Sequence, residues 1–429
     1  MSRLTTARML QPLRRRDFAL LSGGSLVSLL GDGFFYIALA WQVYAISNVP
    51  TALSLVGVAW TVPSVLFVLL GGAFSDRVDR RRLMIGADLL RAAAIGAMAA
   101  LSAAGVIQLW HIAALIIFVG AGDAFFNPAS TAIVPDLVPE SELPAANALG
   151  AMYRNLTQRL AGPAIAGIVI AAFGPAAALG FDAASFVVSA VAVLAIRTRP
   201  APRQAAGGTG VRETIAQVAE GVRYARSKAW IWATLLTGMF ALLVFLGPVE
   251  VLVPFLLKNR LSLGPDSLGL VFAVGGIGSM AMSVLVGALG LPRLRVTVMY
   301  AAFTLGVAVT AGFGLMTALW QAMLITFVVQ GAFQLGQVIW TTMLQQLVPR
   351  QLLGRIASLD WMMSTALVPV SFALTGPVSA ALGAETTVIG AAVVGALLMG
   401  GLLFLPGVRD PERSIGAHAT LTAAPGGAE

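Results

Sequence analysis

The sequence has no cysteine, only two histidines and few charged residues of any kind. Without cysteine there can be no disulfide, thiolate metal site or cysteine nucleophile. His111 and His418 are too few for a multi-histidine metal site, so we expect no metal and no other cofactor. Charged residues form 11% of the 429 residues, against roughly 25% in a typical soluble domain. So few charges cannot cover a water-facing surface of this size, and the expected solvent is lipid.

What the chain has instead is long apolar segments along its whole length. Hydrophobic residues form 58% of it, and the mean hydropathy is +0.88. A membrane-crossing helix needs about 20 mainly apolar residues, and twelve segments meet that need. We therefore predict an all-α polytopic membrane protein with twelve transmembrane helices. The segments are 18–46, 51–75, 83–104, 111–134, 143–172, 176–196, 229–256, 267–289, 296–316, 319–345, 353–382 and 387–406.

The basic residues are distributed unevenly between the two sides of the predicted membrane. If both termini lie inside, 22 of the 27 Lys and Arg residues fall in cytoplasmic stretches, and only Lys258 and Arg260 fall outside. This asymmetry predicts a multi-pass protein of a bacterial-type inner membrane with both termini cytoplasmic. The net charge of +8 and the pI of about 10.7 are explained by this bias. We therefore expect the lipid bilayer, and no nucleic acid, as a partner.

The spans divide into two sets of six. Residues 137–149 (LVPESELPAANAL) and 347–359 (LVPRQLLGRIASL) resemble each other at equivalent loops, which favours a duplicated six-helix unit. One chain that contains both halves is expected to function as a monomer. The predicted order is a cytoplasmic tail (1–17), an N-terminal six-helix bundle (18–196), a cytoplasmic linker with an amphipathic helix (197–228), a C-terminal six-helix bundle (229–406) and a disordered cytoplasmic tail (407–429).

A charged motif, GAFSDRVDRRRLM, lies between the second and third spans at residues 72–84. It resembles the loop signature of the major facilitator superfamily, and the two-bundle fold is what that resemblance implies. A glycine allows close helix packing, and an aspartate at a helix end can hold arginines in one of two conformations. We interpret the motif as a conformational latch, with arginines that serve only as topology signals as the alternative. The latch residues are Gly72, Asp76, Arg77, Arg80 and Arg81, continued into the third span by Asp88 and Arg91.

Other stretches are similar to the efflux branch of the family that includes enterobactin exporters and macrolide efflux proteins. They are residues 126–149, 219–226 and 268–280. In the fifth span, Gly162, Pro163 and Gly167 are similar to the antiporter motif of the family, which implies exchange of a substrate for protons. Ile116 stands where many drug–proton antiporters carry an arginine.

Three acidic residues at membrane depth are candidates for proton coupling or substrate binding. An ionisable side chain there is costly, so it is usually functional or paired. Asp32, Asp123 and Glu250 lie on spans 1, 4 and 7, which line the central cavity in this type of fold. Structural pairing is the alternative for each, and Arg154 or Arg159 on span 5 could neutralise Asp123.

Further polar and aromatic residues at membrane depth have more ordinary interpretations. We expect Asp182 and Asp360 to be structural. Aromatic residues could line an apolar substrate pocket, although lipid contact or helix packing is the more common role for each one. These residues are Phe34, Phe35, Tyr36, Trp41, Phe125, Phe126, Trp340 and Trp361.

Together these observations favour a secondary transporter that exports a small amphipathic drug, siderophore or metabolite in exchange for protons. The alternatives are uptake or uncoupled transport of a small metabolite and, in another class, a non-transporting membrane receptor or scaffold. A membrane enzyme is disfavoured because no cysteine and no histidine cluster supply a nucleophile or metal ligands. A built-in ATP motor is disfavoured because the phosphate-binding glycine loop is missing.

Overall fold

Helices form all of the regular structure in the described part of the chain. A computed structural model describes residues 10–77, 79–198 and 211–412, and the side chains of residues 68–77, 211–218 and 350 lie outside the description. Twelve helical spans among these residues are long and apolar enough to cross a membrane. The predicted all-α fold with twelve transmembrane helices is confirmed. Much of the expected N-terminal tail, linker and C-terminal tail falls outside the described residues.

The N-terminal half contains the first six spans. Its fifth span changes from α-helix to π-helix and back, and each of the two α-helical segments of this span has a proline at its start, Pro144 and Pro163. The elements are α2 (Arg16–Ile46), α3 (Pro50–Arg77), α4 (Arg80–Ala103), α5 (Leu109–Leu137), the fifth span of α6 (Leu143–Arg154), η3 (Asn155–Ala161) and α7 (Gly162–Phe173), and α8 (Pro175–Leu194).

The C-terminal half follows a linker helix, α9 (Val211–Ser227), which packs against the eleventh and seventh spans. The seventh span also contains a π-helix, η4, that begins at Pro248. The elements are α10 (Ala229–Gly247), η4 (Pro248–Leu252) and α11 (Val253–Asn259) in span 7, then α12 (Pro265–Leu289), α13 (Arg295–Val309) with α14 (Ala311–Leu315), α15 (Leu319–Leu347), α16 (Arg350–Ala366) with α17 (Val368–Leu382), and α18 (Ala384–Leu402).

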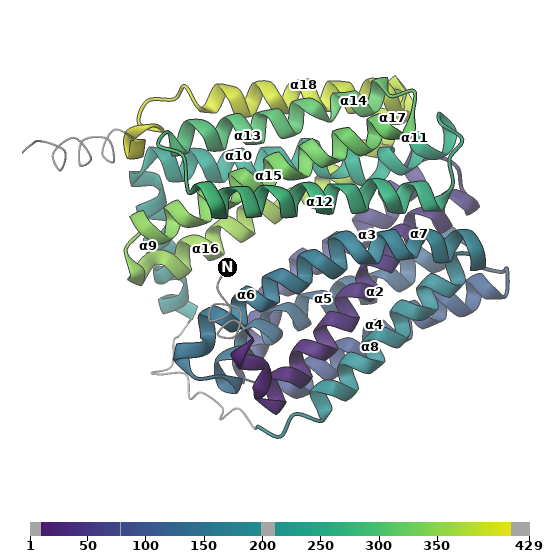
Figure 1. Ribbon diagram of the computed structural model, residues 1–429, viewed down its shortest axis with the longest axis horizontal. Coiled ribbons are helices and arrows are strands. Elements are labelled where there is room, and N and C mark those ends of the chain that lie inside the picture. Colours follow the sequence, from purple (N-terminus) through teal and green to yellow (C-terminus); the bar gives the residue numbers. More distant parts are fainter. Residues whose placement is uncertain (1–9, 78, 199–210, 413–429) are drawn as a thin grey trace, which may run out of the picture.

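The two halves meet at one end of the molecule and diverge toward the other (Figure 1). We call the end that carries α9 the linker end and the opposite end the far end. Helix α3 packs against α17, and α7 packs against α12, so two helix pairs join the halves. In Figure 1 both pairs lie on the right, whereas α6 and α16 stand apart on the left. The molecule is therefore closed at the far end.

The hydrophobic cores follow the same division. One large cluster of buried side chains contains residues of both halves, among them Tyr44, Val56, Val251 and Phe372. At the linker end each half has a core of its own, around Met84 in the N-terminal half and around Trp340 in the C-terminal half. Apolar burial stabilises an interface in proportion to its area. The shared core therefore favours the arrangement in which the far end is closed.

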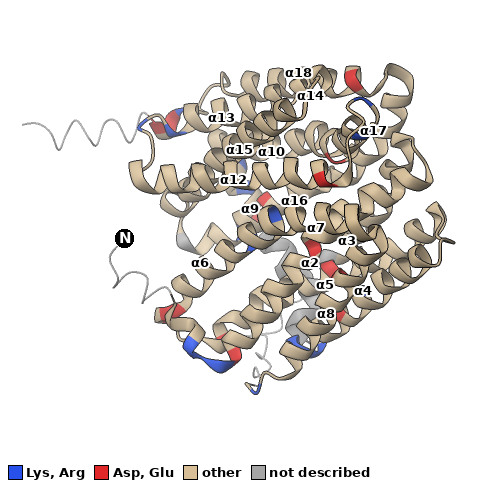
Figure 2. Cartoon of the chain, turned by 45° about the vertical axis from the view of Figure 1, so that its right-hand side comes forward, with Lys and Arg blue, Asp and Glu red and all other residues tan. Residues whose placement is uncertain are grey.

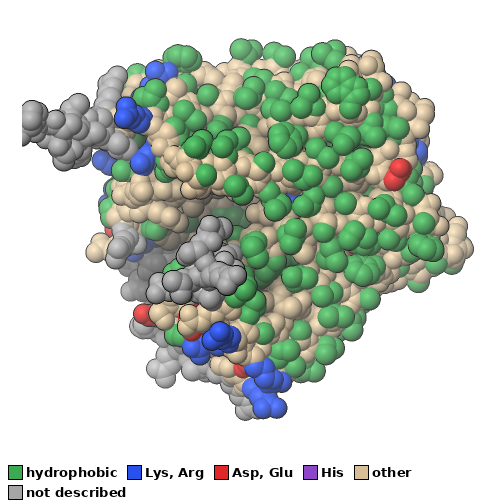
Figure 3. Space-filling view, viewed as in Figure 1, with side chains coloured by type: hydrophobic (Ala, Val, Ile, Leu, Met, Phe, Trp, Pro, Cys, Tyr) green, Lys and Arg blue, Asp and Glu red, His purple; other side chains and the backbone are tan. Residues whose placement is uncertain are grey.

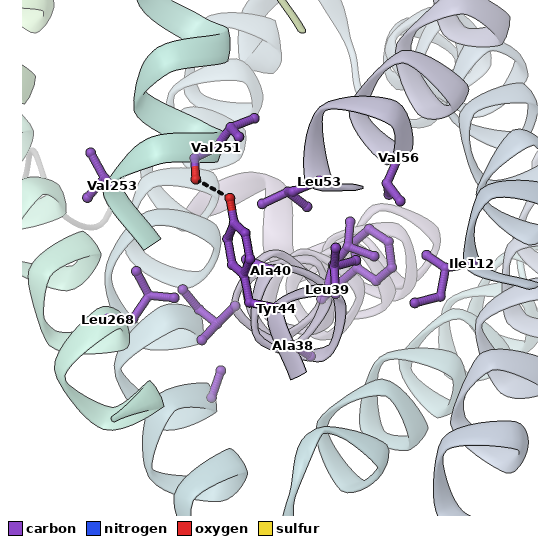
Figure 4. Close-up of a cluster of buried hydrophobic side chains, with 14 of the residues drawn as sticks. Ala38, Leu39, Ala40, Tyr44, Leu53, Val56, Ile112, Val251, Val253 and Leu268 are labelled. Atoms are coloured by element: carbon purple, nitrogen blue, oxygen red, sulfur yellow. Dashed lines mark hydrogen bonds between the residues drawn. The ribbon is translucent and has the colours of Figure 1, made fainter. Parts of the chain in front are cut away.

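Polar contacts reinforce this closure. The Tyr44 hydroxyl donates to the carbonyl oxygen of Val251 at 2.6 Å, between α2 and η4 (Figure 4). The Lys258 ammonium donates to the carbonyl oxygen of Tyr44. The amide of Asn48 donates to the side-chain oxygen of Asn259 at 2.6 Å. Among the described residues, no salt bridge joins the two halves, so these few hydrogen bonds and the apolar core make the contact.

Helix α2 approaches the fifth span closely through glycines. A β-carbon at Gly33 would lie 2.7 Å from the Cα atom of Gly162 and 3.0 Å from the Cδ atom of Pro163. These neighbours are backbone and ring atoms that cannot rotate away. Gly33 therefore allows α2 and the fifth span to cross closely, and a larger residue at this position would push the two helices apart.

We predict that Gly33→Ala lowers the melting temperature of the detergent-solubilised protein, because overpacking costs about 1–3 kcal/mol. Gly23→Ala on the same helix is the matched control, since a β-carbon there meets no atom within 4 Å. Alanine is favoured over glycine in a helix by about 1 kcal/mol, so the control should melt at the same temperature or higher. Equal melting temperatures for the two variants would contradict the close crossing.

Candidate functional site: a charged cavity in the N-terminal half

A cavity of about 620 Å³ lies within the N-terminal half, and all six spans of that half contribute to its wall. It extends from Phe18, near the linker end, to Tyr36 and Trp60 at the middle of the bundle. Asn127 and Arg154 on its wall are exposed, so it is open on the side of α5 and α6. The volume is within the range of small-molecule sites.

Arg91 is the centre of the charges around this cavity. Its guanidinium donates to Asp123 at 2.9 Å and also to Asp88, one turn earlier on α4. Its Cζ atom lies 4.4 Å from the ring centroid of Phe126 and 4.1 Å from that of Phe186. The residue is only 3% exposed. Two carboxylates and two aromatic faces thus compensate for the loss of water around a buried guanidinium.

Asp123 pairs with Arg91, and not with Arg154 or Arg159, which the sequence had offered as possible partners. The physical reason is the packing of α4 on α5. A β-carbon at Gly122 would lie 2.5 Å from the Cγ atom of Arg91, so the glycine leaves room for the arginine beside Asp123. Arg154 and Arg159 are exposed, and neither forms a salt bridge with a described residue.

Two further carboxyl groups reach the cavity without an arginine partner. Asp32 accepts a hydrogen bond from the amide of Gln158 on η3, at 3.3 Å. Asp182 on α8 is fully buried and lies against Gly31, the residue before Asp32. One oxygen of Asp182 is 3.4 Å from the Ser185 hydroxyl, and the other has no hydrogen-bond partner among the described residues. Figure 2 shows acidic residues inside the bundle beside α2 and α5.

The carboxyl groups around this cavity outnumber the guanidinium groups. Among the described residues, Asp32, Asp123 and Asp182 line the cavity together with Arg91 and Arg154, and Asp88 pairs with Arg91 beside it. An uncompensated charge at membrane depth is costly. The groups around the cavity therefore need further positive charge to be electrically neutral, and protons or a bound cation can supply it. The described residues contain no group of three or more His, Asp or Glu side chains placed to hold a metal ion.

Glu250 lies apart from these acids. It belongs to η4 and lines a small pocket of about 40 Å³ that lies between the two halves. It also lines a second pocket, of about 30 Å³, inside the C-terminal half. The structure thus brings Asp32 and Asp123 to one cavity and places Glu250 in another. Tyr36 and Trp60 line both the large cavity and the pocket beside Glu250, so the two spaces are neighbours.

The described part of the predicted latch ties together helix ends within the N-terminal half. Arg80 donates to Asp136 at 2.6 Å and to the carbonyl oxygen of Ala132 at 2.9 Å, which joins α4 to α5. Arg81 donates to the carbonyl oxygen of Leu194 at 3.0 Å, at the end of α8. Asp88 and Arg91 lie deeper, in the charge network. Gly72, Asp76 and Arg77 are on α3, and their side chains lie outside the described residues.

The glycines and proline of span 5 form a junction of three helices. Gly162 lies against Gly33 of α2, where a β-carbon would be 2.8 Å from the Cα atom of Gly33. Gly167 lies against the start of α12 in the other half, with the carbonyl oxygen of Pro265 at 2.8 Å from such an atom. Pro163 is buried between them. This sequence pattern therefore marks a place where the two halves touch.

Only part of the cavity wall could be predicted from the sequence. Phe35, Tyr36 and Phe126 line the cavity, whereas Trp340 donates to Asp360 at 3.0 Å in the other half. Trp60, which donates to Asp123 at 3.1 Å, was not singled out. No sequence pattern identifies it, because its partner comes from another helix. The other expected aromatics, Phe34, Trp41, Phe125 and Trp361, do not line this cavity.

Comparisons with known proteins agree with this geometry. The sequence profile of a family described as "Transmembrane secretion effector" matches residues 7–415. The multidrug efflux pump Tap of Mycolicibacterium fortuitum is 28% identical over 417 residues, covering 93% of this chain and 97% of that protein. Macrolide efflux protein A of Streptococcus pyogenes is 24% identical, covering 82% of this chain and 86% of that protein.

Solved structures share the fold at low sequence identity. The nucleoside transporter NupG has a TM-score of 0.68 at 12% identity, covering 90% of this chain and 98% of that one. A bacterial homologue of the iron transporter ferroportin, in an inward-facing state, has a TM-score of 0.64 at 18% identity, covering 91% of this chain and 99% of that one. With its twelve membrane spans and its two halves, the chain belongs to the transmembrane secretion effector family, in an efflux branch of the major facilitator superfamily.

Proposed function

We propose that the protein exports a small amphipathic molecule in exchange for protons. The observation that carries this proposal is the surplus of carboxyl groups around an open cavity of suitable size. A site with surplus carboxylates can hold a proton or a cationic substrate, and exchange of one for the other is antiport. The named relatives that pump multiple drugs or macrolides support the outward direction by analogy.

The mechanism we propose is alternating access by rocking of the two halves. The cavity is open while the far end is closed, so this state is one half of the cycle. In the other state the shared core at the far end separates and the linker end closes. The glycine-rich crossing of α7 with α12 is where the halves would pivot. The latch residues Arg80 and Arg81 keep helix ends of the N-terminal half together as it moves.

We further propose that the linker end faces the cytoplasm of a bacterial-type inner membrane. Lys and Arg side chains gather at the linker end, and the flanks of the bundle are covered by apolar side chains (Figure 3). The positive-inside rule then places both termini in the cytoplasm. The shared core, with residues of both halves, is complete in one chain, which supports function as a monomer.

Within the cavity we assign Asp32 to proton coupling and substrate attraction. It forms no salt bridge with an arginine of the described part of the chain, and its hydrogen bond with Gln158 is long at 3.3 Å. Asp123 is held by Arg91, which it shares with Asp88, and by Trp60, so its charge is already partly compensated. A cation that enters would compete most easily for Asp32. Apolar and aromatic walls from Phe35, Tyr36 and other residues suit an amphipathic cation.

Asp32→Asn is predicted to abolish substrate-driven proton movement, because the amide leaves no carboxylate at this position where the substrate and a proton can exchange. The measurement is collapse of a proton gradient in inside-out vesicles after addition of macrolides, cationic dyes or siderophores. Glu140→Gln, which removes an exposed acid at the linker end, is the control and should behave like the unmodified protein.

The other outcomes of this assay have clear meanings. Collapse that survives Asp32→Asn would move the proton site to Asp123 or Glu250. Transport of a compound without any proton movement would point to uptake or uncoupled transport. No transport by folded and inserted protein across the panel would favour a receptor or scaffold.

Arg91→Met is predicted to destabilise the protein strongly, since it leaves two carboxylates at membrane depth without their partner. Removal of one member of a buried ion pair costs about 3–5 kcal/mol. The apparent melting temperature in detergent should fall sharply, and it should recover in part when Asp88→Asn and Asp123→Asn are added. If Arg91→Met alone left the stability unchanged, Arg91 would not be what compensates the charges of Asp88 and Asp123.

A further inference from the structure

The position of Glu250 suggests a role that is distinct from binding in the large cavity. Both halves line its pocket, since Leu39, Ala40 and Leu53 come from the N-terminal half and Leu268 from the C-terminal half. Figure 4 labels these four side chains. Other walls come from the C-terminal half: Pro254, Phe272 and Phe372. Leu39, Leu53 and Leu268 also belong to the buried core that joins the halves. The side chain thus points into a space that exists because the far end is closed.

The carboxyl group of Glu250 has no compensating partner there. No hydrogen bond or salt bridge with another described residue involves its side chain. The charged or titratable groups that face it are Tyr36 from α2 and Arg159 from η3, and Arg159 is not within salt-bridge distance. Helices α3, α12, α14, α15 and α17 contribute apolar side chains or neutral polar ones such as Thr326 and Gln330.

Closure of the far end therefore disfavours the ionised form of Glu250, and an ionised Glu250 disfavours closure. The residue next to it, Val251, accepts the hydrogen bond from Tyr44 that ties η4 to α2. When α2 and α3 pack on η4 and α17, they surround the carboxyl group with apolar atoms. An ionised carboxylate in such a space is costly unless paired, and a protonated one is not. π-Helical turns such as η4 recur at functional positions in other helices.

We propose that Glu250 is the proton switch of the far end, which closes when this carboxyl group is protonated and opens when it is ionised. The proton adds to a carboxylate oxygen from water on the far side while that side is open. After closure it leaves to water on the linker side, past Tyr36 and Trp60, which border both the Glu250 pocket and the large cavity. One O–H bond forms and later breaks, so one proton crosses without any other reactant.

This inference rests on the proposed proton-driven function, and it separates two tasks. Asp32 binds the exchanged species in the large cavity, whereas Glu250 links protonation to the conformation of the far end. A test without any transported compound can therefore fail or succeed independently of the export assay.

The experiment measures the far-end conformation by the distance between two spin labels. Because the chain has no cysteine, Ala104→Cys after α4 and Thr386→Cys at the start of α18 give one exposed label on each half at the far end. The labelled protein in lipid nanodiscs is examined over a pH series with no added compound. The same pair is placed in Glu250→Gln, Glu250→Asp and Glu385→Gln. Glu385 is an exposed acid at the same end that pairs with Arg260 inside the C-terminal half.

We expect the labels in the parent protein to shift from the short to the long distance as the pH rises. A single coupled proton changes the ratio of the two populations by at most about tenfold per pH unit. Glu250→Gln should stay at the short distance at every pH, while Glu250→Asp and Glu385→Gln keep the shift. A pH-independent parent, or a Glu250→Gln variant that still opens as the pH rises, would overturn the proposal. Size-exclusion profiles identical to the parent establish that each variant is folded.

Discussion

The cost of an uncompensated charge inside a membrane is the constraint on which the rest of this structure depends. Arg91 can be buried because Asp88, Asp123 and two aromatic rings surround it. Gly122 leaves the space for that arrangement. Because Arg91 is already paired with Asp88 and Asp123, Asp32 and Asp182 are left without a salt bridge to an arginine among the described residues. The same rule that fixes the architecture of the N-terminal half thus leaves sites at which protons or cations can bind.

The two halves have similar topology, but they differ in the position of their cavity and of their buried acidic residues. The N-terminal half contains the large cavity, which is lined by Asp32, Asp123 and Asp182, whereas the C-terminal half places one acid, Glu250, against the contact between the halves. Glycine-rich crossings between α7 and α12 hold the halves together without bulky side chains. A shared apolar core at the far end and separate cores at the linker end produce one open and one closed end.

Much of the fold could be predicted from the sequence, because lipid imposes a length and a polarity on every span. The twelve spans and the family followed from apolar segments and from the motif at residues 72–84. The site could be predicted only in part. Asp32 and Asp123 were recognised as acids at membrane depth, but Arg91 was not foreseen as the partner of Asp123, for which only Arg154 or Arg159 on span 5 had been considered. Trp60, Gln158 and Asp182 were missed as members of the site, since their contacts depend on how separate helices pack.

We propose that the cavity of the N-terminal half is the path of the exported compound and that this path is reached from the cytoplasm. The most direct measurement is alkylation of Asn127→Cys, an exposed position on the cavity wall, in the otherwise cysteine-free protein. A membrane-impermeant maleimide is applied to inside-out and to right-side-out vesicles, with and without a macrolide. The account predicts rapid reaction in inside-out vesicles and slower reaction when a transported macrolide is present. Equal reaction from both sides, or no protection by a compound that the protein transports, would contradict it.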